Sequence, residues 1–216
     1  NIKFNGVSFK YPNTDNLIID NLNLNINIGD KIVIFGKSGS GKSTIFKLLM
    51  GFFSPIKGEI LVNNENINNL ELSFYRNQFA YVTQDTKLFD MTVIENIKYS
   101  INVTNEDIYN LISKYNINPV FEKLEKGLET NAGTDGNNLS GGQKQMVLIL
   151  RALLKKPKIY LFDEPTSALD PDTRKVIYNI LKDIKETTLV ISHDPKIKEY
   201  INNVYSLENS RLSIKK

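Results

Sequence analysis

The sequence predicts an α/β fold with a mostly parallel core sheet and a helical subdomain inserted into it. Strand-like and helix-like segments alternate near both ends of the chain, as in parallel sheets joined by crossover helices. The middle of the chain, near residues 93–155, reads mainly as helices. A glycine-rich loop separates an apolar strand from an amphipathic helix, an arrangement that favours phosphate binding. The 216 residues are enough for one large domain.

The N-terminal part of the chain is expected to form strands around one helix. Residues 2–9 alternate well enough for a strand, and four apolar residues that alternate with asparagine predict another: Leu22, Leu24, Ile26 and Ile28. Residues 31–35 form a continuous apolar strand. Beyond the glycine-rich loop, one face of a helix is predicted from the spacing of Ile45, Leu48 and Leu49. Short strands are expected at residues 58–62 and 79–82.

Helices dominate the middle of the chain, and strands return toward its C-terminus. The expected helices cover residues 93–99, 105–115, 140–154 and 172–185. Thr104 precedes the second of these helices, which has acids in its first turn, and together they mark a helix start. The third helix is apolar on most faces, so we expect it to be buried. The expected strands cover residues 158–162, 188–192, 204–207 and 212–214.

The composition limits the classes of partner. Hydrophobic residues make up 41% and charged residues 24% of the chain, as in ordinary globular proteins. The net charge of +3 comes from scattered Lys and Arg, so we expect a dispersed positive surface and no nucleic-acid partner. Cysteine is absent, which excludes a disulfide framework and suits a reducing compartment. No apolar run approaches the roughly 18–20 residues that span a bilayer.

The glycine-rich loop at residues 36–44 reads GKSGSGKST and fits the pattern GxxxxGK(S/T) without a mismatch. Glycines let the chain curl so that backbone N–H groups face a phosphate, and the next helix adds its positive dipole end. A flexible linker is the alternative, but an apolar strand enters this loop and an amphipathic helix leaves it. Lys42 is expected to reach the β- and γ-phosphates, and the Ser43 hydroxyl to ligate Mg²⁺. The predicted nucleotide-binding residues here are Gly36, Lys37, Ser38, Gly39, Ser40, Gly41, Lys42, Ser43 and Thr44.

Two acidic residues follow the apolar strand at residues 159–162. Because ligands of parallel sheets sit at the carboxyl ends of the strands, Asp163 and Glu164 are placed to meet a nucleotide. Asp163 is expected to hold Mg²⁺, directly or through a water, and Glu164 to accept a proton from the attacking water or to orient it. A solvated acidic turn would explain the pair alone. Its position about 120 residues after Lys42 favours the catalytic interpretation.

A second anion-binding helix end is predicted at the sequence LSGGQ, which covers residues 139–143. Ser140 is expected to cap the helix that begins at Gly141. Gly141 and Gly142 would let another backbone approach closely, since neither carries a side chain. An ordinary helix start explains the serine but not the two adjacent glycines.

In this order and at these separations, the three motifs resemble those of the nucleotide-binding domain of ATP-binding cassette (ABC) proteins, over nearly the whole chain. The resemblance implies a P-loop NTPase core with a mostly parallel sheet, an antiparallel β subdomain and an inserted α-helical subdomain that carries LSGGQ. Within one nucleotide-binding domain at residues 1–216, the core would cover approximately residues 1–84 and 157–216. The helical subdomain would cover approximately residues 85–156.

The resemblance also implies a partner and a reaction. Two copies would bind head to tail around two Mg-ATP molecules and hydrolyse them. In such a dimer the γ-phosphate held by one copy is gripped by the signature of the other, at Ser140, Gly141, Gly142 and Gln143. The SALD sequence at residues 167–170 resembles the loop that crosses the dimer interface, and Asp170 is expected to help bind the nucleotide.

Three further residues match positions with roles in the ABC family. Gln84 follows the strand at residues 79–82 and corresponds to a glutamine that senses Mg²⁺ and water and couples to a membrane partner. His193, the single histidine, corresponds to the switch histidine that contacts the γ-phosphate, although a lone histidine is more often structural. Tyr11 matches the aromatic residue that stacks on adenine, and an exposed turn tyrosine is the alternative.

Three segments look most like ABC exporters: VSFKYP, residues 84–97 and residues 130–145. In exporters this domain follows six membrane helices on the same polypeptide. Since the chain begins at Asn1 directly on a strand-like segment, we expect a piece of such a protein at the cytoplasmic face of a membrane. Two residues depart from the exporter pattern: Thr134, followed by Asp135, replaces a glutamate, and Met146 replaces an arginine.

Other ABC classes remain as alternatives. A soluble ATPase of DNA maintenance would insert a long coiled coil between the phosphate loop and LSGGQ, for which the chain has no heptad run and no room. A translation ATPase would carry two cassettes and a charged arm, and many stand-alone importer subunits carry an extra C-terminal domain. A regulatory module that does not hydrolyse ATP is disfavoured because Glu164, His193 and Gln84 are all present.

Overall fold

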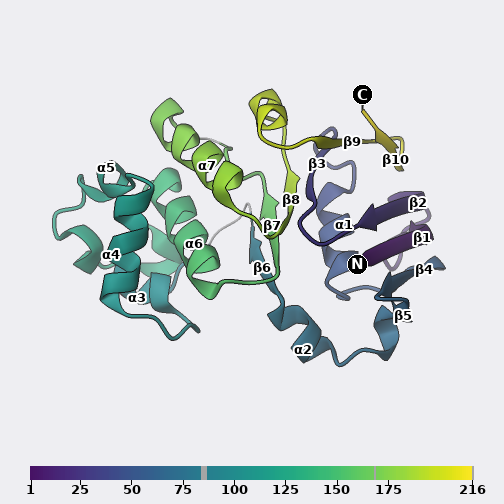
Figure 1. Cartoon of the computed structure of the whole chain (residues 1–216), viewed down its shortest axis with the longest axis horizontal. Helices are drawn as coiled ribbons and strands as arrows, with labels where there is room; N and C mark the ends of the chain where they lie inside the picture. Colours follow the sequence, from purple (N-terminus) through teal and green to yellow (C-terminus); the bar gives the residue numbers. More distant parts are fainter. Residues whose placement is uncertain (84–86, 168, 216) are drawn as a thin grey trace.

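The computed structural model describes residues 1–83, 87–167 and 169–215 (Figure 1). Its strands are β1 (Ile2–Phe9), β2 (Ile19–Ile26), β3 (Lys31–Phe35), β4 (Lys57–Val62), β5 (Glu65–Asn66), β6 (Phe79–Val82), β7 (Ile159–Asp163), β8 (Thr187–Ile191), β9 (Asn203–Glu208) and β10 (Arg211–Ile214). Its α-helices are α1 (Lys42–Leu49), α2 (Leu72–Asn77), α3 (Val93–Lys98), α4 (Asn105–Lys114), α5 (Asn118–Phe121), α6 (Gly141–Lys155) and α7 (Pro171–Asp183). Short 3₁₀ helices are η1 (Ile67–Asn69), η2 (Gly127–Glu129), η3 (Thr134–Gly136) and η4 (Pro195–Glu199).

Two sheets organise these elements. The larger sheet has the strand order β10-β9-β3-β8-β7-β6, and all its neighbouring pairs are parallel except β9 with β10. The smaller sheet has the order β2-β1-β4-β5 and is antiparallel throughout. The expected mostly parallel core and antiparallel β subdomain are therefore confirmed. Because β3, β7 and β8 run in parallel, their carboxyl ends meet at one edge of the sheet.

The larger sheet is buried on both faces, as its continuous apolar strands predict. Successive residues of β7 point to opposite sides: Tyr160 and Phe162 belong to the same apolar cluster as α6 and α7. Leu161 belongs to a second cluster, with α1 and the antiparallel sheet. In Figure 1, α1 accordingly lies between the two sheets, whereas α3 to α6 form the part of the molecule farthest from the antiparallel sheet.

Local signals fix several helix starts. The predicted start at Thr104 is confirmed, because its side chain accepts from the N–H of Asp107, whose carboxylate accepts from the N–H of Thr104. Thr92 forms the same reciprocal cap with Glu95 at α3. These paired hydrogen bonds satisfy backbone donors that a helix start would otherwise leave free.

The structure differs from the sequence expectations at short elements. The alternating pattern predicted a strand through Ile28, but β2 ends at Ile26 and Ile28 is 90% exposed. The chain turns there, since the Asp30 carboxylate accepts from the N–H of Asn27 and Gly29 has a φ of +82°. Helices α2 and α5, of six and four residues, were not predicted. No helix of residues 1–83, 87–167 and 169–215 is long and apolar enough to cross a membrane.

Candidate functional site

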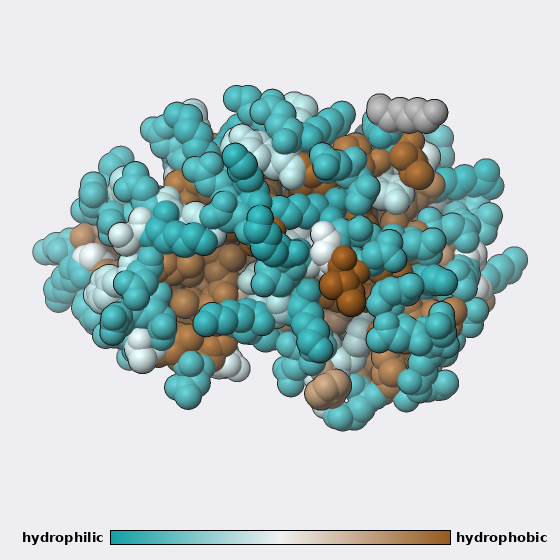
Figure 2. Space-filling model, viewed as in Figure 1, coloured by the Kyte–Doolittle hydropathy of each residue, from teal (hydrophilic) through white to brown (hydrophobic). Residues whose placement is uncertain are grey.

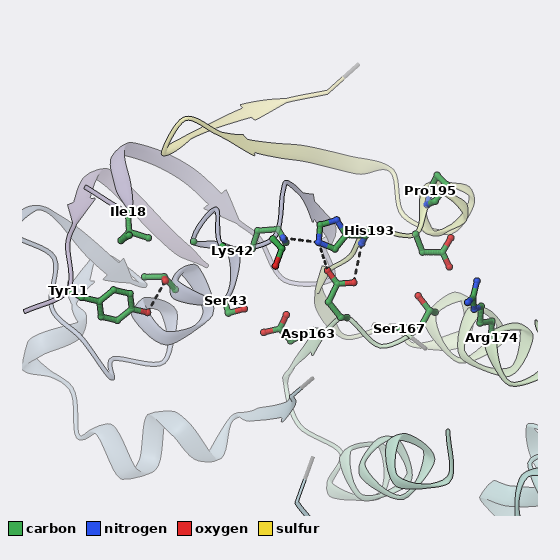
Figure 3. A pocket seen from close by; sticks show the side chains of 16 residues that line it. Tyr11, Ile18, Lys42, Ser43, Asp163, Ser167, Arg174, His193 and Pro195 are labelled. Carbon is green, nitrogen blue, oxygen red and sulfur yellow. Dashed lines mark hydrogen bonds and ion pairs between the residues drawn. The ribbon is translucent and has the colours of Figure 1, made fainter. Parts of the chain in front are cut away.

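A cleft of about 670 Å³ lies between the glycine-rich loop and the carboxyl ends of β7 and β8 (Figure 3). The residues that line it are Tyr11, Ile18, Ser38, Gly39, Gly41, Lys42, Ser43, Thr44, Asp163, Glu164, Thr166, Ser167, Arg174, His193, Asp194 and Pro195. The structure therefore brings together side chains that are separated by more than half of the sequence. The glycine-rich loop and residues 163–164 and 193 come to one place because β3, β7 and β8 are parallel neighbours that end at the same sheet edge.

The glycine-rich loop delivers the N-terminus of α1 to the cleft. Gly41 caps this helix with a φ of +99°, and no side chain satisfies the cap. A Cβ atom on Gly41 would lie 2.5 Å from Cγ2 of Ile18, so glycine is required for both conformation and space. The first turn of α1 has no acidic residue, and its positive dipole end is suited to bind an anion.

Lys42, Glu164 and His193 form one contact network at the centre of the cleft (Figure 3). Lys42 Nζ donates to the carbonyl oxygens of Gly36 and Lys37 at 2.8 and 3.0 Å, and lies 3.3 Å from His193 Nε2. Burial lowers the pKa of Lys42, and the charges of Glu164 and Asp163 oppose this shift. The ammonium group is thus held in the cleft by weak neutral acceptors, which a phosphate oxygen could replace.

Glu164 is the acidic residue of this network, and both its backbone and its side chain are constrained. It is nearly buried and has a φ of +52°, a conformation that residues other than glycine rarely adopt and that often marks functional sites. Its Oε2 accepts from the N–H of His193 at 3.1 Å. Its Oε1 lies 3.2 Å from His193 Nε2 but makes no hydrogen bond of proper geometry within the described part of the chain. Burial raises the pKa of Glu164, while the His193 N–H and the positive charges nearby lower it by less. The raised pKa makes the carboxylate a better proton acceptor.

The side-chain oxygen atoms of Ser43 and Asp163 are suitable ligands for a magnesium ion that binds together with a nucleotide. Both residues line the cleft, and Figure 3 shows the Asp163 carboxylate directed toward Ser43. Hydroxyl and carboxylate oxygens are ligands that Mg²⁺ prefers, and Mg²⁺ needs few protein ligands when phosphates supply others. The described residues contain no group of three His, Cys, Asp or Glu side chains that could hold a metal ion. Gln84, the third predicted metal ligand, lies outside the described residues.

Tyr11 stands at the opposite end of the cleft from Arg174 (Figure 3). Its ring makes edge contacts with Phe9 and Phe53, whose centroids lie 5.1 and 5.4 Å away. Its hydroxyl lies 2.9 Å from Thr44 Oγ1, in the first turn of α1. The ring is therefore fixed beside the phosphate loop, as a platform for a flat base requires.

The LSGGQ segment forms the second predicted helix end, but away from this cleft. Ser140 Oγ accepts from the N–H of Gln143, and the Gln143 side chain accepts from the N–H of Ser140. Ser140 and Gly141 are exposed, and a Cβ atom on Gly141 would meet no atom of the described residues within 4 Å. None of residues 140–143 is among the described residues that line the cleft. The fold therefore does not explain Gly141, and the helix end is open to a partner.

Asp170 has a local role and also lies outside the cleft. Its carboxylate caps α7 by accepting from the N–H groups of Asp172 and Thr173. In the loop that links β7 to α7, Thr166 and Ser167 line the cleft while Asp170 does not. Any contact of Asp170 with a nucleotide stays a prediction.

Sequence reasoning missed several residues that line the cleft or contact a residue that lines it. Arg174, on α7, lines the cleft and donates to the Leu169 carbonyl oxygen, and no motif pointed to it. Asp194 and Pro195 also line it, and their position directly after His193, which follows β8, was a usable signal. Tyr81, on β6, donates to Asp163 Oδ2 at 3.1 Å, which only the pairing of β6 with β7 could reveal. Burial, together with the charge of Asp163, raises the pKa of Tyr81 above its ordinary value.

Comparisons with known proteins agree with this geometry. The sequence profile of the ABC transporter family matches residues 19–167. ABC transporter B family member 14 of Arabidopsis thaliana is 41% identical over 89% of this chain and 16% of its own length. The ATP-dependent lipid A-core flippase of Pectobacterium atrosepticum and the mitochondrial iron-sulfur clusters transporter ATM1 of Saccharomyces cerevisiae are each 37% identical over 98% of the chain. The chain spans 37% and 31% of these two proteins.

A solved structure extends the similarity to three dimensions. A bacterial Atm1-family ABC exporter with ATP bound superimposes with a TM-score of 0.91 and 33% identity. The match covers 98% of this chain and 38% of the exporter chain. The fold of the whole chain is thus that of one part of a larger protein of this kind.

Proposed function

Because the chain belongs to the ABC transporter family, we propose that it drives a membrane exporter as one of two copies that enclose two Mg-ATP molecules. Family membership makes it an ATP-binding domain that hydrolyses ATP. Beyond ATP hydrolysis, we infer that two copies assemble, that Mg²⁺ accompanies the ATP, and that a membrane domain is the partner. It also assigns the helical subdomain to approximately residues 85–156, between two parts of the core.

The dimer is inferred from one observation: the chain has two helix ends suited to bind an anion, at α1 and α6, and they lie apart. Helix α1 points into the cleft with Lys42 and Ser43, whereas α6 begins at an exposed Ser140 outside it. A Cβ atom on Gly141 would meet no atom of the described residues within 4 Å, so packing among these residues does not require glycine there. A second copy placed head to tail would bring this helix end to the phosphate bound by its partner.

Five residues of the cleft would act in hydrolysis. Lys42 would give its donors to phosphate oxygens in place of the loop carbonyls that it now contacts. Ser43 and Asp163 would hold the magnesium ion, which neutralises charge on the phosphates. Glu164 would take the proton from the attacking water or orient that water. His193, fixed by its contacts with Glu164 and Lys42, would meet the γ-phosphate.

The names of the relatives favour an exporter over the alternatives. A flippase, an iron-sulfur clusters transporter and an Atm1-family exporter are all membrane transporters, and each extends well beyond the matched part. A translation ATPase, a DNA-maintenance ATPase or an importer subunit receives no comparable support from these relatives. A transmembrane domain on the same polypeptide would place this chain at the cytoplasmic face of a membrane.

The helical part of the chain offers a surface for such a membrane partner. Figure 2 shows apolar surface gathered over the helices of residues 93–155. Phe89 and Tyr99 stack at 4.1 Å while 44% and 43% of their surfaces stay exposed. The Arg151 guanidinium lies 5.5 Å from the Tyr99 ring and is anchored on the Asn96 carbonyl oxygen. Exposed aromatic residues beside an arginine are typical of protein interfaces.

Assembly and metal dependence test the proposed function directly. The isolated chain is expected to be a monomer without nucleotide and to dimerise when ATP is added, because the ligands supply most of the interface. Size-exclusion chromatography with light scattering measures this change in oligomeric state.

EDTA should block phosphate release from ATP, and an excess of Mg²⁺ should restore it. A tight dimer without nucleotide, or hydrolysis that continues in EDTA, would contradict the proposal.

Replacing Tyr11 tests the adenine platform. Tyr11→Ala is expected to weaken ATP binding by about 0.5–1.5 kcal/mol, because ring stacking is lost. Tyr11→Phe, which keeps the ring and removes the hydroxyl near Thr44, should retain most of the affinity. Calorimetric titration with ATP and GTP measures both variants. We expect weak discrimination between the purines, and GTP binding at least tenfold weaker than ATP would indicate an additional base-reading group.

A further inference from the structure

Tyr81 makes a contact with the candidate metal ligand that no sequence motif records. Its hydroxyl donates to Asp163 Oδ2 at 3.1 Å. Strand β6 runs parallel to β7 with Tyr81 opposite Leu161, and Asp163 stands two residues beyond Leu161 on the same face of the sheet. This face turns toward α1, the helix that carries Lys42 and Ser43.

The position of the Tyr81 ring is fixed by the same helix. Phe46 of α1 is fully buried and meets the Tyr81 ring edge to face, with centroids 5.9 Å apart and planes at 89°. Phe46 stands one turn after Ser43, so the tyrosine packs against the element that carries the other candidate metal ligand. The Tyr81 ring therefore packs against the helix that carries Ser43, while its hydroxyl contacts Asp163.

A carboxylate at a strand end rotates unless a neighbour fixes it. A hydrogen bond to Oδ2 restricts the rotation of the Asp163 carboxylate and leaves Oδ1 for another partner. Partners that orient a ligating carboxylate strengthen metal binding without touching the metal. We propose that Tyr81 is a positioning residue that presents Oδ1 of Asp163 to the magnesium ion of Mg-ATP.

This inference rests on the proposed function, since it requires an ATP site that uses magnesium. It differs from a packing role, in which the hydroxyl only satisfies a polar contact in the core. A packing role predicts that losing the hydroxyl changes stability alone. A positioning role predicts a change confined to the part of ATP binding that depends on magnesium.

The test uses Tyr81→Phe, which keeps the ring and removes the donor. A non-hydrolysable ATP analogue is titrated in EDTA and across a series of Mg²⁺ concentrations, with calorimetry as the readout. Affinity in EDTA is expected to stay within about twofold of the parent. The Mg²⁺ concentration that gives half of the maximal increase in analogue affinity should rise about tenfold. Electron paramagnetic resonance with Mn²⁺ in place of Mg²⁺ should give the same loss of metal affinity.

Two controls separate the outcomes. Tyr75→Phe removes another tyrosine hydroxyl, which donates to the Leu49 carbonyl oxygen away from the cleft, and should leave the Mg²⁺ response unchanged. In an Asp163→Ala background, Tyr81→Phe should add no further loss, because its effect passes through that carboxylate. An Mg²⁺ response of Tyr81→Phe equal to the parent's would overturn the inference and leave the proposed function intact. A parent chain whose ATP binding ignores Mg²⁺ would overturn both.

Discussion

Glu164→Gln is expected to abolish steady-state ATP hydrolysis while ATP binding persists. A positioned proton acceptor contributes roughly 10²–10⁴-fold to a rate, so turnover should fall by that factor. Gln keeps the shape and an oxygen that accepts from the His193 N–H, as Glu164 Oε2 does here. What it cannot do is take a proton from water. Phosphate release measures the loss, and a nucleotide titration checks that binding is retained.

The pH profile of the parent enzyme should report the same residue. Burial raises the pKa of Glu164, so its carboxylate becomes protonated at a higher pH than an exposed glutamate. Hydrolysis should therefore decline as the pH falls through this raised pKa. The residual activity of Glu164→Gln should lack that limb, because an amide does not titrate there.

The Glu164→Gln variant also reveals the assembly. ATP that is bound but not hydrolysed should hold two copies together, and light scattering should then detect a stable dimer. Glu59→Gln, which changes an exposed glutamate on β4, is the matched control and should hydrolyse ATP normally. Turnover of Glu164→Gln within two- or threefold of the parent would remove Glu164 from the proposed chemistry.

Two inactive variants, Ser140→Arg and Lys42→Ala, should recover ATPase activity when they are mixed. Ser140→Arg blocks the exposed end of α6, and Lys42→Ala removes the lysine ammonium of the glycine-rich loop from the cleft. A mixed dimer combines the intact cleft of the first variant with the intact α6 end of the second. Each mixed dimer thus holds one complete site, so partial activity is expected where each variant alone has almost none.

The binding properties of the two variants should differ in advance of mixing. Ser140→Arg should bind ATP almost as the parent does, because Ser140 does not line the cleft of its own chain. Lys42→Ala should bind ATP more weakly. The serine substitution also removes a helix cap, at a cost of about 1 kcal/mol. Thr104→Arg, which removes the equivalent reciprocal cap of α4, is the matched control and should stay active. Loss of ATP binding by the Ser140→Arg monomer would place the signature in its own site.

The sequence by itself determined most elements and the chemistry they carry. The GxxxxGK(S/T) loop and the carboxyl pair at residues 163–164 are local patterns that physics ties to phosphate and magnesium. Apolar runs located β3, β7 and α6 within one residue. Hydrophobic periodicity misplaced the end of β2, because the turn at Asp30 depends on hydrogen bonds that a period does not encode.

The tertiary structure alone decided which residues meet. Lys42 and His193 are separated by 151 positions, yet the parallel strands place their side chains 3.3 Å apart. The contact of Tyr81 with Asp163 depends on the register of β6 against β7, and Arg174 reaches the cleft only through the path of α7. The exclusion of Ser140 from the cleft is likewise a result of the fold, because α1 and α6 pack on opposite faces of one sheet. Local patterns specify chemistry within a few residues, whereas proximity across a sheet follows from strand order and register, which are long-range properties.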